Sequence, residues 1–197
     1  LPDQGAGHFA RTIEAIKERD PGVLVEVLIP DFRGETDLVD RIVDAGPDVL
    51  AHNVETVERL QWPVRDRRAG YEQSLSVLER AADTAGVYTK TSLMLGLGEY
   101  DHEIYRALSD CREAGVDVVT LGQYLQPSRS HLDVYEYVHP DAFETWRRVA
   151  EEELGFLYCA SGPMVRSSYR AGELFVDAVL RDGRSVEEAR REAHAAT

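Results

Sequence analysis

Short apolar runs alternate with single amphipathic segments up to residue 121, and glycine or proline turns separate them. Apolar residues recur at helical spacing within residues 9–16, 38–42, 71–82 and 104–111, and apolar runs occupy residues 23–29, 48–51, 88–95 and 116–121. Strands joined by single helices pair in parallel through right-handed crossovers. Runs that are apolar throughout indicate strands buried on both faces. The pattern therefore predicts an α/β fold with a parallel sheet.

Such a sheet either curves into a barrel or stays open, with helices on both faces. An open dinucleotide-binding sheet carries a G-x-G-x-x-G motif between a strand and a helix. Gly96-Leu97-Gly98 follows a predicted strand but lacks the third glycine, so a partial barrel is favoured. Later in the chain we expect a helix from Pro140, a short strand at residues 156–160, and a terminal helix from Ser185 without a particular role.

Composition excludes several classes of protein. The chain has 197 residues and 43% hydrophobic content, which suits one domain with a core. A net charge of −14 argues against nucleic-acid binding and suggests a salt-rich cytoplasm that screens self-repulsion. No apolar stretch approaches membrane-spanning length, so we expect a cytoplasmic protein without membrane contact. Cys111 and Cys159 stand far apart, and we interpret both as buried apolar side chains rather than a disulfide framework.

Four motifs combine polar residues and glycines in a way that core packing does not require. They are HNVET at residues 52–56, TKTSLMLGLGE at 89–99, TLGQYLQPS at 120–128 and GPMVRSSYRAG at 162–172. Each follows or contains the carboxyl end of a predicted strand, where barrels gather functional groups. Taken alone, the two hydroxyls of the last motif fit a helix start. Similarly, His52-Asn53 fits a turn bonded to local backbone, and Glu99 a carboxylate at a helix N-terminus.

Together these motifs closely resemble those of lipoyl synthase, and the resemblance extends from Leu1 to about Gly172. It implies a partial TIM-type (β/α) barrel at residues 1–125 that lacks its first strands, and a C-terminal extension at 126–197. It also implies a radical S-adenosylmethionine (SAM) enzyme that inserts sulfur at C6 and C8 of an octanoyl chain. The implied partners are an octanoylated lipoyl carrier domain or H protein and an electron donor such as ferredoxin or flavodoxin.

The resemblance implies two [4Fe-4S] clusters, one of which is consumed as the sulfur source. The family holds one cluster with a C-x-x-x-C-x-x-C motif, and the other with three further cysteines and a serine. Cys111 and Cys159 match none of these positions, and the chain begins at Leu1. Because the clusters need thiolate ligands, we expect the chain to be a piece of the enzyme and inactive alone.

The resemblance places SAM where the first three motifs converge. The polar groups of SAM are a carboxylate, an amine and ribose hydroxyls, and together they need one donor, one acceptor and one cation from the protein. Asn53, Glu55 and Lys90 are our candidates for these contacts. Gln123 is a further candidate for cofactor binding.

The resemblance also assigns a role to the R-S-S-Y motif. It makes Ser168 the oxygen ligand of one iron of the auxiliary cluster, with Ser167 as the second choice. A bound metal stabilises the deprotonated hydroxyl, and Arg166 is placed to hydrogen-bond that oxygen or a cluster sulfide. We expect an alkoxide to leave iron more easily than a thiolate, which suits a cluster that is dismantled.

Two other functions remain open at this point. A lone lysine on a barrel strand can form a Schiff base, so Lys90 also supports an aldolase-like enzyme. Alternatively, the chain is a non-catalytic remnant that binds a carrier protein. The loop-rich residues 127–132 and 138–140 can cover the site or meet a carrier domain.

Overall fold

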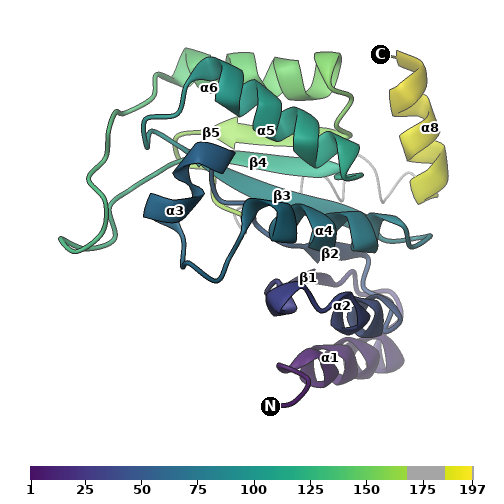
Figure 1. The fold of residues 1–197 in the computed structure, drawn as a ribbon. Coiled ribbons are helices and arrows are strands. Elements are labelled where there is room, and N and C mark those ends of the chain that lie inside the picture. The colour runs from purple at the N-terminus through teal and green to yellow at the C-terminus, as the bar shows by residue number, and fades with distance from the viewer. Residues whose placement is uncertain (168–184, 197) are drawn as a thin grey trace.

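A computed structural model describes residues 1–167 and 185–196. In that part of the chain five parallel strands form one sheet, in the order β1-β2-β3-β4-β5 (Figure 1). The strands are β1 (Glu26–Leu28), β2 (Val49–Ala51), β3 (Tyr88–Leu95), β4 (Val118–Gln123) and β5 (Tyr158–Gly162). Every crossover moves to the next strand in the same direction, whereas a doubly wound sheet reverses. The predicted partial (β/α) barrel is therefore confirmed.

The connecting helices lie along the outer face of this sheet (Figure 1). The helices and helical turns are α1 (Ala6–Arg19), η1 (Phe32–Gly34), α2 (Thr36–Val43), η2 (Glu58–Leu60), α3 (Gln61–Val64), α4 (Tyr71–Ala82), α5 (Asp101–Glu113), α6 (Pro140–Arg148), the π-helical turn η3 (Val149–Glu153) and α8 (Val186–Ala196). Helix α4 and strand β3 coincide with the segments predicted from periodicity. Helix α3 was not predicted, because four residues are too few to show a helical repeat. Among the described residues, none of the helices combines the length and the hydrophobicity that a membrane span requires.

Two apolar clusters join the outer face of the sheet to the helices. In one, Leu93 and Leu121 of neighbouring strands pack with Leu108 of α5. In the other, Leu50 of β2 packs with Ile42 of α2. All five side chains are fully buried, and each contributes about 1.5–3 kcal/mol relative to an exposed position. The helical stripes therefore fix the outer face, and the opposite residues of each strand point into the barrel.

Helix α8 covers the amino-terminal end of the inner face. Val49, Tyr88 and Val118 lie at the starts of β2, β3 and β4, and they pack against Val186 and Ala189 of α8. The expectation of a terminal helix without a particular role was therefore wrong. The apolar stripe of α8 is short, and the strands that it packs against are distant in sequence. The sequence around α8 therefore does not indicate this packing.

Several strand boundaries differ from those predicted. Only Glu26–Leu28 of the run at residues 23–29 forms a strand, and Leu28 is 51% exposed at the edge of the sheet. Strands β4 and β5 each begin two residues later than the apolar runs at 116–121 and 156–160. Val116 and Phe156 are buried in the core but precede the paired strands. Each apolar run therefore begins before the residues that form strand hydrogen bonds.

The expectation of strands that are apolar throughout was wrong for β3. Thr89, Lys90, Thr91 and Ser92 are all buried polar residues. Their side chains find internal partners: the Thr89 hydroxyl donates to Asp117, and Lys90 pairs with Glu26. Buried polar groups are tolerated when they are hydrogen-bonded in this way. Strand β5, from beyond residue 125, joins the same sheet, and the division into two domains at that residue stays a prediction.

Candidate cofactor site at the carboxyl ends of the strands

A cavity of about 170 Å³ lies at the carboxyl ends of the central strands. We call it the strand-end cavity. Residues from all four sequence motifs line it: Asn53, Glu55, Ser92, Leu93, Met94, Gly122, Gln123, Leu125, Val165, Arg166 and Ser167. The structure therefore brings together motifs that extend from Asn53 to Ser167 along the chain, as parallel strands predict.

Glu55 presents its side chain to this cavity from a strained turn. Its φ is 71°, a left-handed value that is uncommon for residues other than glycine. The Thr56 N–H donates to Val54 O, two residues back, at 3.0 Å, so the turn is a γ-turn centred on Glu55. The Glu55 backbone also bonds β3, since its N–H donates to Ser92 O and its carbonyl accepts from Met94 N. Backbone strain of this kind is often concentrated at functional sites.

Asn53 fixes the direction of the Glu55 carboxylate. Its Nδ2 donates to Glu55 Oε1 at 3.2 Å, and both side chains are half-buried. The amide keeps an oxygen acceptor, and the carboxylate keeps acceptor capacity beyond this bond. The pair can thus accept hydrogen bonds from hydroxyl or ammonium groups that enter the cavity.

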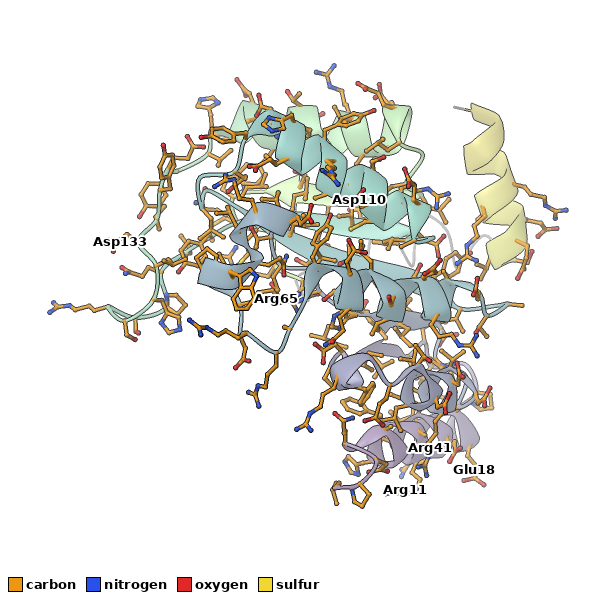
Figure 2. All side chains as sticks on the ribbon, viewed as in Figure 1. Arg11, Glu18, Arg41, Arg65, Asp110 and Asp133 are labelled. Atoms are coloured by element: carbon orange, nitrogen blue, oxygen red, sulfur yellow. The ribbon has the colours of Figure 1, made fainter. Side chains whose placement is uncertain are left out.

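Gln123 lines the cavity, but its amide is already bonded to the protein. Nε2 donates to the carbonyls of Tyr124 and Glu136, and Oε1 accepts from Val138 N at 2.9 Å. The side chain therefore ties β4 to residues 136–138. That contact anchors an exposed arm that projects from the sheet and carries Asp133 (Figure 2). Sequence reasoning proposed a cofactor contact here and missed the structural one.

Arg166 reaches the cavity from the segment after β5. Its Nη1 donates to Val165 O at 2.7 Å and to Pro163 O at 3.3 Å. Gly122 makes this approach possible, because a Cβ at that position would lie 2.3 Å from Val165 O. Ser167 also lines the cavity, whereas Ser168 and Tyr169 lie outside the described residues.

Lys90 is not brought to the strand-end cavity. It shares the inner face of β3 with Ser92 and Met94 but lies nearer the amino end, and its side chain is 4% exposed. Its ammonium donates to Glu26 Oε1 of β1 at 2.6 Å. Both the cofactor contact and the Schiff base proposed for this residue require the ammonium to leave that partner. The alternation of side chains along β3 predicts that Lys90 faces the barrel interior, but it does not predict how far Lys90 lies from the carboxyl end of the strand.

His52 and Glu99 have structural partners. The His52 ring is buried between Ile29 O and Ser74 Oγ, each at 3.0 Å, and burial lowers the pKa of its imidazole. Its partners come from distant elements rather than from the local backbone. The Glu99 carboxylate accepts from the N–H groups of Gly96 and Leu97, which shapes the loop after β3.

The described residues do not fit an iron–sulfur cluster. Cys111 and Cys159 are buried and unpaired with each other, and burial raises the pKa of Cys111 to about 12. Burial raises the pKa of Cys159 as well, so both thiols stay protonated, as expected for apolar core residues. Within residues 1–167 and 185–196, no group of three or more His, Cys, Asp or Glu side chains can hold a metal ion.

A larger cavity of about 670 Å³ lies on the helix side of the sheet, between α3, the start of α4 and helix α5. We call it the helix-side cavity. Two of its polar contacts are internal: Arg59 forms an ion pair with Glu103, and the Tyr71 hydroxyl donates to Asp110. In (β/α) barrels the reacting groups gather at the carboxyl ends of the strands instead. The strand-end cavity is therefore the better candidate.

The fold and the position of this cavity are those of a (β/α)-barrel enzyme with its site at the carboxyl ends of the strands. The chain matches the Radical SAM superfamily over residues 3–111, which is more than half of its length, and it belongs to that superfamily. Membership implies SAM and iron–sulfur chemistry. Within the superfamily, the resemblance to lipoyl synthase that the motifs indicated is confirmed by comparison with curated relatives.

The chain is 77% identical to the lipoyl synthase of Halobacterium salinarum over 196 residues, which cover 100% of this chain and 63% of that protein. It is 73% identical to the lipoyl synthase of Halorubrum lacusprofundi, again over 100% of this chain and 63% of that protein. It is 55% identical to the chloroplastic lipoyl synthase of Chlamydomonas reinhardtii, over 99% of this chain and 45% of the relative. The chain thus spans less than two thirds of the length of these relatives.

Proposed function

We propose that the chain forms the SAM-binding part of a lipoyl synthase, which inserts sulfur at C6 and C8 of an octanoyl chain on a carrier-domain lysine. The observation that carries the proposal is the convergence of Asn53, Glu55, Ser92 and Arg166 on one cavity. The similarity to lipoyl synthases over the whole chain supports it.

The lining residues suit the polar groups of SAM. Glu55 and the Asn53 oxygen supply acceptors for the amine or the ribose hydroxyls, and Ser92 supplies a hydroxyl. Arg166 is a cation that lines the cavity, where a carboxylate can reach it. A volume of 170 Å³ accommodates part of the cofactor, since complete small-molecule sites usually measure about 300–1,000 Å³. In this proposal Asn53 and Glu55 orient the cofactor, and Lys90 supports the barrel interior beneath them.

Two [4Fe-4S] clusters would supply the electron that cleaves SAM and the sulfur that is inserted. The described residues provide no set of thiolate ligands for either cluster. We therefore derive no step of the cluster chemistry from this structure. For the auxiliary cluster we keep Ser168 as the proposed oxygen ligand and Arg166 as its hydrogen-bond partner, on the basis of the R-S-S-Y motif.

The substrate in this proposal is an octanoylated lipoyl carrier domain or H protein, and the reductant is a ferredoxin or flavodoxin. We place the reaction in the cytoplasm, as the sequence predicts.

The test uses a full-length lipoyl synthase that carries these 197 residues, with an octanoylated carrier domain as substrate. Mass spectrometry is expected to show two added sulfur atoms per carrier, together with 5′-deoxyadenosine. Ser168→Ala is expected to abolish sulfur insertion, and Ser167→Ala, at the second-choice position, to retain more of it. Iron–sulfur spectra that are indifferent to the loss of both hydroxyls would contradict the ligand assignment, and an octanoyl chain left unmodified by the parent enzyme would contradict the function.

A further inference from the structure

The strained turn at Glu55 is held from behind by the side chain of Gln61. Gln61 begins α3 and is only 5% exposed. Its Nε2 donates to Val54 O at 3.1 Å and to Thr56 O at 2.6 Å. These two carbonyls flank Glu55, so one amide group holds the backbone on both sides of the strained residue. A positive φ at a residue with a side chain persists only when its surroundings hold it in place.

The Gln61 amide is itself fixed by Arg65. Nη1 of Arg65 donates to Gln61 Oε1 at 3.1 Å, to Val54 O at 3.3 Å and to Ser74 Oγ at 2.8 Å. Arg65 projects beneath α3, where Figure 2 labels it. The hydroxyl of Ser74 also contacts His52 Nε2. These hydrogen bonds therefore connect Gln61 and Arg65 to the first residue of the HNVET motif. Because Gln61 accepts from a charged donor and donates to two carbonyls, its rotamer is determined by its partners.

Gln61 does not line the strand-end cavity. Its effect on that cavity must therefore pass through the turn that it holds. If the turn relaxed, Glu55 would move away from its bonds with Ser92 and Met94, and the Asn53–Glu55 pair would lose its fixed direction. Binding groups need this kind of support to stay in a productive geometry.

We infer that Gln61 is a positioning residue, which sets the direction of the Glu55 carboxylate in the strand-end cavity without touching the ligand. This inference rests on the proposed function, in which Glu55 binds SAM. It adds a requirement that the SAM contacts alone do not impose: a buried amide on α3 governs cofactor affinity through the turn at residues 54–56.

The experiment is a double-mutant cycle read by equilibrium binding of SAM to the full-length enzyme that carries this chain. The variants are Gln61→Met, which keeps the volume and removes both donors, Glu55→Ala, and the combination. Gln73→Met is the matched control, because the Gln73 amide also donates two hydrogen bonds but makes them to Asp31 and Arg68 O, away from the turn. Melting temperatures are measured in parallel. If Gln61→Met does not accumulate as folded protein, Gln61→Glu replaces it, since it keeps the oxygen that accepts from Arg65.

We expect Gln61→Met to raise the dissociation constant of SAM by about tenfold, and to have almost no further effect once Glu55 is alanine. The control is expected to leave affinity unchanged. A Gln61 effect of equal size in both backgrounds would overturn the inference, because it would not pass through Glu55. No Gln61 effect beside a strong Glu55 effect would also overturn it while leaving the proposed function intact. No Glu55 effect would instead overturn the SAM contact itself.

Discussion

Arg190 of α8 forms a bidentate ion pair with Asp117, which lies just before β4 and is completely buried. Nε and Nη2 of Arg190 each donate to a different Asp117 oxygen at 2.8 Å, and Nη1 donates to Ala82 O. The same carboxylate accepts from Thr89 N. One side chain of the last helix therefore connects α8 to the amino-terminal ends of the central strands.

Arg190→Met is expected to destabilise the protein by about 3–5 kcal/mol, because it leaves the Asp117 charge buried without its main partner. The matched control is Arg191→Met, since the exposed Arg191 contacts only its own helix, at Glu187 O, among the bonds of the described residues. Urea unfolding of both variants measures the difference in free energy. Equal stability of the two variants would contradict a role for α8 in holding the sheet.

His52 makes stability depend on pH. Burial lowers the pKa of its imidazole below the ordinary value of 6.5, so the folded protein holds the neutral ring while the unfolded chain takes up a proton near pH 6.5. Its contribution is therefore complete above pH 6.5 and is lost as the pH falls toward the lower pKa of the folded state. The loss has an upper limit of about 1.4 kcal/mol per pH unit.

Urea midpoints at pH 7.5 and 5.5 test this dependence. His52→Gln is expected to show a smaller fall between the two pH values than the parent protein, and His8→Gln, at an exposed position, to behave like the parent. A His52→Gln variant that loses as much stability as the parent would show that another group causes the dependence.

Because of the γ-turn at Glu55, two variants that both lose the carboxylate are expected to differ in stability. Glycine adopts a φ of 71° without strain, whereas alanine keeps the strain of the glutamate. Glu55→Gly is therefore expected to be more stable than Glu55→Ala by about 1 kcal/mol, although both lose the carboxylate. Chemical unfolding of the pair provides the comparison. An alanine variant as stable as the glycine variant would argue against a strained turn.

Gly122 and Gly162 form a natural pair for testing the approach of the R-S-S-Y segment. A Cβ at Gly122 would lie 2.3 Å from Val165 O, whereas the nearest atom to a Cβ at Gly162 is Val165 Cγ2 at 3.5 Å. We expect Gly122→Ala to cost about 1–3 kcal/mol and to displace Arg166 from the cavity. Gly162→Ala should be tolerated. Thermal unfolding and SAM binding of both variants measure the contrast, and equal behaviour would contradict the close approach.

Much of the fold followed from local pattern. Helical spacing and apolar runs predicted α4 and β3, and the order of strands and helices predicted a partial barrel. The docking of α8 could not be predicted in this way, because Arg190 and Asp117 are 73 residues apart and both look like ordinary surface residues. Local periodicity contains no information about a pairing at that distance.

The site was predicted in part. Asn53 and Glu55 line the strand-end cavity as expected from motifs at strand ends, and Arg166 joins them. Lys90 does not, because Glu26 of the edge strand pairs with it inside the barrel. The supporting role of Gln61 was missed, since an isolated glutamine next to Trp62 reads as a surface residue until the turn it bonds is seen.

The most direct test of the account measures the affinity of SAM for the full-length enzyme that carries this chain, before and after Glu55→Gln. Glu113→Gln on the outer helix α5 serves as the matched control, because that carboxylate contacts only Ser109 among the described residues. We predict that Glu55→Gln weakens binding by about tenfold or more while the control binds like the parent. Unchanged affinity in Glu55→Gln, with the protein folded, would contradict the assignment of the strand-end cavity to this cofactor.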